Sequence, residues 1–378
     1  MASEHPVLLT RISAIKPHPN ADNLEIAEIE GWQTLPSKGE FKVGDKVIFI
    51  PVDSVVPDEW AEKWNIKKYL GGSRHDRVRC ARLRGEPSYG FAVAVPDELK
   101  DTKVGTDVKD FFGITKYLPP VRNSHPNAPQ GKARVSHPLF DKYTGIENLR
   151  NYKNLFYPGE QVYVTEKIHG ANVRISYLDT QVERKDFWSR VLRFLQIKNR
   201  MEWTEEFVCG SHNVQREIPE DPTTIPYTYP LTIPGVRELL SYIKLTHGAK
   251  QVILYGEVFG PKIQKINYGV KEGFGFMAFD IKVDGEYLNV RDFEDSCDTF
   301  KIPRVPVLYE GPFIMETIQK LSEGKTTVKG ANHVIEGTVV KPIIESRTLQ
   351  GKRKILKCKG ADYMMWKESK KGSDYTEE

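Results

Sequence analysis

A lysine next to a glycine turn is the first group in this chain that could do chemistry. Residues 164–172 read Val-Thr-Glu-Lys-Ile-His-Gly-Ala-Asn, so Lys167 ends an alternating run and Gly170 follows three residues later. A strand would fix the direction of the lysine, and a glycine lets the backbone approach a ligand closely. Lys167 is therefore a candidate covalent nucleophile. The pattern alone is weak, because a surface lysine before a turn has the same residues.

Three later segments strengthen this interpretation. Glu257 and Glu336 each lie beside a glycine within otherwise apolar runs. Lys357 and Lys359 are two residues apart, so both would point from one face of a strand. Charged side chains on an inward face of a sheet are costly unless they bind something. Two carboxylates and three lysines on converging strands would suit a nucleoside triphosphate and a divalent metal ion.

The segments that would hold these groups predict an α+β domain built on antiparallel sheet. Alternating apolar runs predict strands at 161–165, 173–178, 251–258, 275–283, 334–340 and 354–358. The first two runs are predicted to pair as a hairpin across the Lys167 turn. Helical spacing over 236–245 follows Pro234, and a proline suits the start of a helix.

The N-terminal third has a different pattern. Short alternating runs, separated by Gly, Pro, Asn and Asp clusters, fill residues 7–112 and predict a small all-β barrel or sandwich. Prolines then gather among polar residues at 113–138, which is typical of a linker. The predicted division is an all-β domain at 1–112, a linker at 113–138, a second domain at 139–366 and a charged tail at 367–378.

The overall composition limits the class of protein. The 378 residues are 39% hydrophobic and 11% aromatic, which predicts packed cores in two or three domains rather than disorder. A net charge of +4 is too small to indicate a nucleic-acid partner by itself. Four widely spaced cysteines predict thiols in the cytoplasm or another reducing compartment. No apolar run approaches the roughly 20 residues that span a bilayer, so we expect no membrane partner. We also expect a monomer.

Taken in order, the chemical motifs resemble those of a known superfamily. The ordered set is Lys167-Ile-His-Gly, Glu257, the run 276–281, Glu336-Gly and Lys357-Cys-Lys. It is similar to motifs I, III, IIIa, IV and V of the covalent nucleotidyltransferases, which include DNA ligases, RNA ligases and mRNA capping enzymes. The histidine of the first motif, His169, resembles the RNA-ligase branch, as does segment 140–148. The resemblance covers about residue 140 to 360.

This resemblance implies an ATP-dependent RNA ligase that acts in three steps. Lys167 would attack the α-phosphorus of ATP, forming lysyl-AMP and releasing pyrophosphate. AMP would then pass to the 5′-phosphate of one RNA end, and the 3′-hydroxyl of another end would expel it. A lysine has an ordinary pKa of about 10.4, so neutral amine costs about 4 kcal/mol near pH 7.5. Neighbouring lysines and a bound Mg²⁺ or Mn²⁺ would lower that pKa and stabilise charge on the phosphate.

The resemblance also implies a role for each motif residue. Lys167, Lys357 and Lys359 would be catalytic, Glu257 and Glu336 would hold the metal ion, and Glu166, Ile168, Gly170, Asn172, Glu257, Phe276 and Lys341 would bind the nucleotide. Phe276 would stack on adenine, or else be a buried strand residue. Asn172 would hold the nucleotide or close the turn, and Lys341 would face phosphate or solvent. The motif Ia position, often an arginine, falls on either His212 or Arg216.

The N-terminal segments carry a resemblance of their own. Residues 18–24 and 81–90 resemble parts of tRNA-binding OB domains, and an OB domain ahead of the ligase domain looks like one small RNA-ligase clade. Arg77 and Arg79 would point from one strand face, with Tyr69 and Tyr89 nearby, toward an RNA backbone. We expect this domain to hold the RNA ends, and a fragment without it to keep a complete nucleotide pocket.

Two other interpretations stay open at this point. A capping-type guanylyltransferase would use GTP in place of ATP, and an RNA-binding protein could carry a transferase domain that no longer works. An inactive transferase would rarely keep all five reactive or charged motif residues, which are Lys167, Glu257, Glu336, Lys357 and Lys359. An insert at 184–200 has six basic residues and an apolar set. We expect it to form a helix packed on its own domain, the alternative being a basic amphipathic helix on RNA or a membrane surface.

Overall fold

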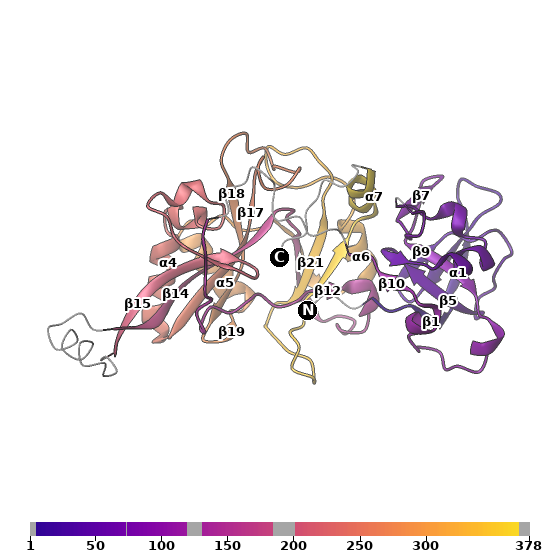
Figure 1. Cartoon of the computed structure of the whole chain (residues 1–378), viewed down its shortest axis with the longest axis horizontal. Coiled ribbons are helices and arrows are strands. Elements are labelled where there is room, and N and C mark those ends of the chain that lie inside the picture. Colours follow the sequence, from indigo (N-terminus) through magenta and orange to yellow (C-terminus); the bar gives the residue numbers. More distant parts are fainter. Residues whose placement is uncertain (1–4, 73, 119–130, 184–200, 370–378) are drawn as a thin grey trace.

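The computed structural model describes residues 5–72, 74–118, 131–183 and 201–369. They fold into an all-β N-terminal domain at one end of an elongated molecule and a larger two-sheet domain at the other (Figure 1). The helix expected at 184–200 lies outside the described residues. No helix in the described ranges is both long enough and apolar enough to cross a bilayer.

Short strands enclose two apolar clusters in the N-terminal domain. Its sheets have the orders β1-β5-β9, β2-β3-β4, β10-β6 and β7-β8. The elements are β1 (Leu8–Arg11), β2 (Ala14–Pro17), β3 (Glu25–Ile29), β4 (Trp32–Thr34), β5 (Lys46–Pro51), β6 (Ser54–Val55), α1 (Asp58–Lys63), β7 (Ala81–Leu83), β8 (Glu86–Ser88), β9 (Gly90–Ala94), α2 (Lys109–Phe112) and β10 (Thr115–Lys116). Alternate residues of β5 belong to different clusters. Ile48 and Ile50 pack in one cluster, and Val47 and Phe49 pack in the other. The predicted all-β architecture is confirmed.

Two sheets form the larger domain, in the orders β11-β16-β15-β14-β17-β18-β19 and β12-β22-β21-β13-β20. The seven-stranded sheet contains β11 (Ala133–Arg134), β14 (Ala171–Glu183), β15 (Met201–Ser211), β16 (Gln215–Arg216), β17 (Gln251–Phe259), β18 (Gly275–Val283) and β19 (Glu286–Tyr287). The five-stranded sheet contains β12 (Glu147–Asn148), β13 (Gln161–Glu166), β20 (Val307–Pro312), β21 (Gly337–Pro342) and β22 (Leu356–Lys359). The β12–β22 pair is parallel, and the other described pairings within these two sheets are antiparallel.

Helices pack beside these sheets, and one of them, the last, also reaches the cavity described below. They are α4 (Val236–His247), α5 (Val290–Thr299), α6 (Met315–Leu321) and α7 (Ala361–Ser369). The apolar stripe of α4, which includes Leu239, Leu240 and Ile243, packs on one face of the seven-stranded sheet. The helix ends at Gly248, whose left-handed conformation (φ +60°) suits a residue without a Cβ. The helix predicted over 236–245 is therefore confirmed.

The hairpin predicted across the Lys167 turn is wrong. β13 pairs with β20 and β21 in the five-stranded sheet, whereas β14 pairs with β15 and β17 in the seven-stranded sheet. The opposite face of the seven-stranded sheet turns toward the five-stranded one, because Tyr255 and Phe279 of the first lie in one cluster with Val339 of the second. The turn therefore crosses between two sheets that face one another.

The predicted domain limits also shift. β10 pairs with β6, so the N-terminal domain continues past residue 112. β11 pairs with β16, so the predicted linker is shorter at its other end as well. α7 continues to Ser369, and residues 367–369 belong to a helix rather than to a charged tail. Proline content and charge indicated these limits, but neither property reports which backbone groups pair.

Two of the N-terminal residues expected near RNA, Arg77 and Tyr89, form contacts within the protein, whereas Tyr69 is 62% exposed. Arg77 forms an ion pair with Asp53, and its guanidinium carbon lies 3.9 Å from the centroid of the Tyr117 ring. Tyr89 is only 5% exposed, and its hydroxyl donates to Glu323 of the larger domain. The expected exposure of Tyr89 to RNA is wrong, because its ring is buried in the contact between the domains.

Candidate active site

A cavity of about 300 Å³ lies between the two sheets of the larger domain. Among the residues singled out in the sequence, those that line it are Glu166, Lys167, Ile168, His169, Gly170, Asn172, Glu257, Glu336 and Lys341. Residues 167–170 enter the cavity wall where the chain passes from β13 to β14. Segments far apart in the sequence thus meet because each sheet contributes one wall.

The turn that carries Lys167 is held by both sheets. The Lys167 N–H donates to the carbonyl of Gly337 (2.9 Å), and the Gly170 N–H donates to the Glu257 carboxylate (3.0 Å). A Cβ at Gly170 would lie 2.3 Å from the Val258 carbonyl oxygen, so only glycine fits there without a shift of the backbone. The lysine is thereby fixed at one point of the cavity wall.

A buried carboxylate stands next to this lysine. Glu336 is 3% exposed, and its carboxylate lies 3.1 Å from Lys167 Nζ, 3.7 Å from Lys359 Nζ and 3.6 Å from His169 Nδ1. Burial by itself would raise the pKa of Glu336, but Lys167, a hydrogen bond from His169 and Lys359 together hold that pKa well below its ordinary value. Glu336 is therefore ionised at neutral pH.

The two lysines predicted to share a strand face do so on β22. Both are partly buried, and they pair with Val339 and Gly337 of β21, beside Glu336. Burial, then the charges of Lys359 and Lys167, lower the pKa of Lys357 to about 7. Burial also lowers the pKa of Lys359, while Glu336 opposes that shift. Neither lysine is among the residues that line the cavity, and both lie on the strand next to Glu336.

Two tyrosines support the histidine of the first motif. Tyr268 Oη accepts a hydrogen bond from the His169 backbone N–H (2.7 Å), and Tyr363 Oη lies 3.1 Å from His169 Nδ1. The three side chains are each less than a tenth exposed. His169 therefore has a fixed orientation beside Glu336.

Comparison with known proteins identifies the family. The sequence model of the RNA ligase family matches residues 160–359, more than half of the chain. The chain belongs to the RNA ligase family. A second model, described as an OB-fold domain, matches residues 7–95. The predicted family, enzyme class and N-terminal OB fold are confirmed, and RNA ligation is favoured over a capping-type activity.

Solved structures of an RNA ligase from Naegleria gruberi have a similar fold. A mutant in the apo form has a TM-score of 0.67 and 22% identity, covering 98% of this chain and 100% of that one. A mutant with ATP and Mn and another with AMP and Mn have the same TM-score and identity, each covering 96% of this chain and 99% of the other. At this identity the likeness establishes the fold, and it confirms the predicted α+β class. No curated protein matches the chain.

The apolar end of the ligase cavity contains a different phenylalanine from the one expected. Phe276 is 4% exposed and belongs to the core cluster beneath α4, on the face of β18 away from the cavity. Phe279 lines the cavity instead, together with Tyr143, Ile146 and Ile355. The choice of Phe276 for base stacking is therefore wrong. The run 276–281 contains two phenylalanines three residues apart, which a strand directs to opposite faces.

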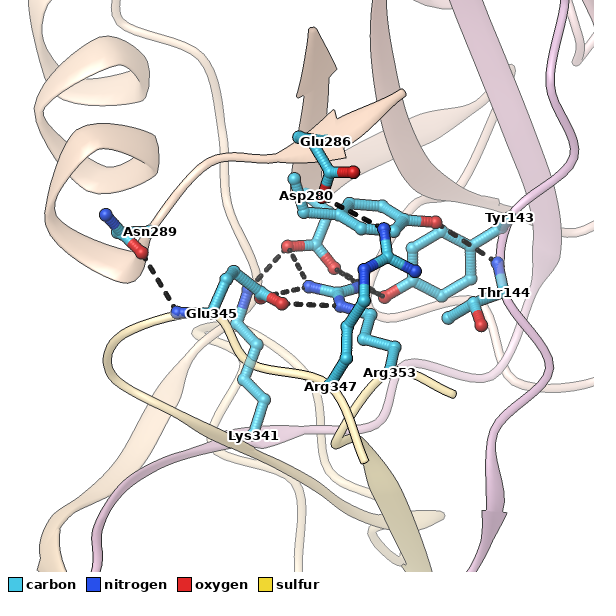
Figure 2. Close-up of polar contacts among 10 residues, drawn as sticks. Tyr143, Thr144, Asp280, Glu286, Asn289, Lys341, Glu345, Arg347 and Arg353 are labelled. Carbon is cyan, nitrogen blue, oxygen red and sulfur yellow. Dashed lines mark hydrogen bonds and ion pairs between the residues drawn. The ribbon is translucent and has the colours of Figure 1, made fainter. Parts of the chain in front are cut away.

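A dense polar cluster forms the wall behind this apolar end (Figure 2). Asp280 accepts two hydrogen bonds from the Arg353 guanidinium, at 2.9 and 3.1 Å, and a third from Lys341 Nζ. The Tyr143 hydroxyl also donates to Asp280, and Glu345 holds the other side of Arg353. Although burial would raise it, Arg353 and Lys341 lower the pKa of Asp280 to about 2. Lys341 thus pairs with a buried carboxylate and is only 4% exposed, so the solvent-facing alternative is wrong. Lys341 also lines the cavity, and its role in nucleotide binding stays a prediction.

The first motif's glutamate has a supporting role in this ligase. Glu166 is 1% exposed, and its carboxylate accepts hydrogen bonds from the Thr327 N–H (2.8 Å), the Thr327 hydroxyl (2.7 Å) and the Thr326 hydroxyl. These contacts tie the end of β13 to the loop before Glu336. Neither His212 nor Arg216 is among the residues that line the cavity, so the structure assigns no motif Ia contact to either of them.

Sequence reasoning missed several residues of the ligase cavity. These are Tyr143, Ile146, Gln264, Phe279, Tyr363 and Lys367. Tyr143 and Ile146 lie inside segment 140–148, whose resemblance to the opening of a ligase domain was a usable signal. Tyr363 and Lys367 lie on α7, beyond the last motif, where no pattern pointed to the site.

The described part of the ligase contains no group of three or more acidic, histidine or cysteine side chains that could hold a metal ion. Glu257 and Glu336 nevertheless both line the cavity, and Mg²⁺ or Mn²⁺ can be held by one or two carboxylates with several waters. The donor set therefore fits a water-rich divalent ion rather than a fully enclosed metal centre.

Proposed function

We propose that this chain is an ATP-dependent RNA ligase that seals 3′-hydroxyl and 5′-phosphate RNA ends through lysyl-AMP and RNA-adenylate intermediates. The observation that carries the proposal is the position of Lys167, on a turn that requires glycine, beside Glu336 and a strand with two further lysines. Family membership supports RNA as the substrate. The presence of ATP and Mn in structures of the Naegleria gruberi ligase supports ATP as the nucleotide.

The two ends of the cavity suggest how ATP would lie. Phe279, Tyr143 and Ile146 offer an apolar end for the base, where an aromatic ring can stack on adenine. The α-phosphate would lie next to Lys167, and Lys367 on α7 would approach the remaining phosphates. Asn172 and Glu257, which are register partners on β14 and β17, would contact the ribose or the metal ion.

In the first step the Lys167 amine attacks the α-phosphorus of ATP. A nitrogen–phosphorus bond forms, the bond to the bridging oxygen of the β-phosphate breaks, and pyrophosphate leaves with that electron pair. The ammonium proton must first pass to water, which reaches this partly exposed amine, whereas the Glu336 contact at 3.1 Å favours the charged ammonium. A divalent ion held by Glu336 and Glu257 would supply positive charge that weakens this contact and neutralises the phosphates.

The two lysines of β22, Lys357 and Lys359, would neutralise negative charge in all three steps. Each step places negative charge on a phosphate or a leaving group next to Glu336, and Lys359 lies 3.7 Å from that carboxylate. Lys357, with a pKa near 7, would take up a proton when phosphate arrives. Preorganised cations of this kind stabilise the transition state more than the ground state.

The same proposal covers the substrate and the cellular compartment of the protein. The substrates would be the ends of nicked, splinted or broken RNA, joined by a monomer. All four cysteines are buried thiols, which supports the cytoplasm or another reducing compartment.

The test is direct labelling of the protein. Purified enzyme with α-labelled ATP and Mg²⁺ or Mn²⁺ should give a covalent adduct on a denaturing gel that is stable to alkali and released by acid, as a nitrogen–phosphorus bond requires, and α-labelled GTP should give none. Lys167→Ala should abolish both the adduct and overall sealing but keep the ability to join RNA that is already adenylated. Label on another lysine, or a preference for GTP, would refute the proposal.

A further inference from the structure

The OB domain is docked firmly on the ligase domain. Trp32 Nε1 donates to the Asn151 side chain (3.1 Å), and Arg82 donates to Asp362 at the start of α7 (2.8 Å). Ala361 of α7 is buried in the same apolar cluster as Trp32. Figure 1 shows the OB domain next to α6 and α7, on the side of the ligase domain away from α4.

One OB-domain side chain touches two separate supports of the nucleotide site. Tyr89, between β8 and β9, places its ring 4.2 Å from the guanidinium carbon of Arg150. Its hydroxyl donates to Glu323 Oε1 (3.2 Å). Arg150 and Glu323 are both residues of the ligase domain, and each contacts a different element of the site.

The first support runs through Arg150 to β22. Arg150 is 3% exposed, and its Nη1 donates to the Lys359 carbonyl oxygen (3.2 Å) and to Cys358 Sγ (3.2 Å). The Tyr89 ring centroid lies 4.2 Å from the guanidinium carbon, closer than that of Trp32 at 5.6 Å, and a cation over an aromatic face is attractive. Arg150 thus fixes the backbone of the strand that presents Lys357 and Lys359.

The second support runs through Glu323 to α7. The Glu323 carboxylate accepts from the backbone N–H groups of Ala361 (2.8 Å) and Asp362 (3.4 Å). These donors are among those that a helix leaves without an intrahelical partner, and an acid there also suits the helix dipole. α7 then carries Tyr363 to His169 and Lys367 into the cavity wall.

We propose that Tyr89 is a positioning residue of the adenylation site, through which docking of the OB domain holds β22 and α7 in place. This inference rests on the proposed function, because it assigns Tyr89 to the lysyl-AMP step. It replaces the expectation that the OB domain serves RNA alone, since removing that domain would expose Arg150 and take a donor from Glu323.

The test compares full-length variants that keep the fold. Tyr89→Leu removes both contacts and should slow lysyl-AMP formation at saturating ATP by on the order of tenfold, with a smaller change in KM. Tyr89→Phe keeps the ring over Arg150 and should slow it only about two- to threefold. Tyr117→Phe and Tyr117→Leu are matched controls, because Tyr117 also lies under an arginine, Arg77, within the OB domain. Both controls should form lysyl-AMP at the wild-type rate.

A second measurement separates positioning from general stability. In the protein without nucleotide, hydrogen exchange of the α7 peptide 361–369 should be faster in Tyr89→Leu than in Tyr117→Leu, when the two variants have matched melting temperatures. Unchanged α7 exchange, or a rate of adduct formation within twofold of wild type for folded Tyr89→Leu, would overturn the inference. If the wild-type protein itself forms no lysyl-AMP, the proposed function fails, and the exchange comparison still decides whether Tyr89 holds α7.

Discussion

The two ends of the cavity each contain a buried carboxylate surrounded by cations, and only one of them is suited to chemistry. Asp280 is held by a two-pronged contact from Arg353 and by Lys341, with Tyr143 as a further donor. Glu336 has looser contacts, from 3.1 to 3.7 Å. Asp280 accepts hydrogen bonds from three side chains and is held in place by them. Lys167, Lys359 and His169 lie farther from Glu336, so these side chains can move from the carboxylate to a ligand.

Charge balance separates the two clusters further. At the Asp280 end, Glu345 forms an ion pair with Arg353, so two acids meet two bases. At the Glu336 end, Lys167 and Lys359 share one carboxylate, and Lys357 lies on the same strand face as Lys359. The Asp280 cluster, in which acids and bases balance, stabilises the cavity wall. The Glu336 cluster has more basic than acidic side chains, which favours a phosphate ligand.

The largest effect should come from breaking the balanced cluster. Asp280→Ala leaves Lys341 and Arg353 buried without this carboxylate, and we expect it to lower the free energy of unfolding by about 3–5 kcal/mol. Urea unfolding followed by fluorescence measures this. Asp280→Asn retains the shape and should cost less. A loss below about 1 kcal/mol for the alanine variant would contradict a structural role for Asp280.

Replacing the carboxylate of the Glu336 cluster should affect activity more than stability. Glu336→Gln should slow lysyl-AMP formation by about 10²–10³-fold, because it removes the charge that organises Lys167 and Lys359. Its effect on the free energy of unfolding should stay within about 1 kcal/mol, since the two lysines retain contact with water. Single-turnover labelling and urea unfolding give the two values. A large loss in the free energy of unfolding of Glu336→Gln, with a normal rate of labelling, would mean that Glu336 is a structural residue rather than a catalytic one.

The two phenylalanines of β18 sharpen the comparison at the base end. Phe279→Ala should raise KM for ATP about tenfold, as expected from the loss of a stacking ring. Phe276→Leu changes a core position on the other face and should mainly lower the melting temperature. Steady-state labelling over a range of ATP concentrations, with a thermal melt of each variant, distinguishes the two. A raised KM for Phe276→Leu alone would restore the role first assigned to it.

The smallest effect concerns one proton. Because the pKa of Lys357 is about 7, this amine is mostly neutral at pH 8 and mostly charged at pH 6. Phosphate would favour the charged form, so ATP binding should take up close to one proton at pH 8 and little at pH 6. Calorimetry in buffers of different ionisation enthalpy measures the uptake, and Lys357→Met should remove it. Equal uptake at both pH values would show that Lys357 does not meet phosphate.

Local patterns in the sequence determined which residues could act. Alternation along a strand is a property of the backbone, so the shared face of Lys357 and Lys359 could be predicted before any partner was known. The glycine three residues after Lys167 and the helix predicted over 236–245 follow from equally local rules. The order of motifs added the family, because the types and spacing of these residues are unusual in combination.

Tertiary structure alone decided where those residues lie. β13 and β14 belong to different sheets, Phe279 rather than Phe276 meets the cavity, and Lys341 pairs with Asp280. α7 enters the site from beyond the last motif, held by the OB domain. Each of these outcomes depends on contacts between segments more than sixty residues apart or on which sheet face is buried. Periodicity gives a strand two faces, and only packing against other segments determines which face becomes the cavity wall.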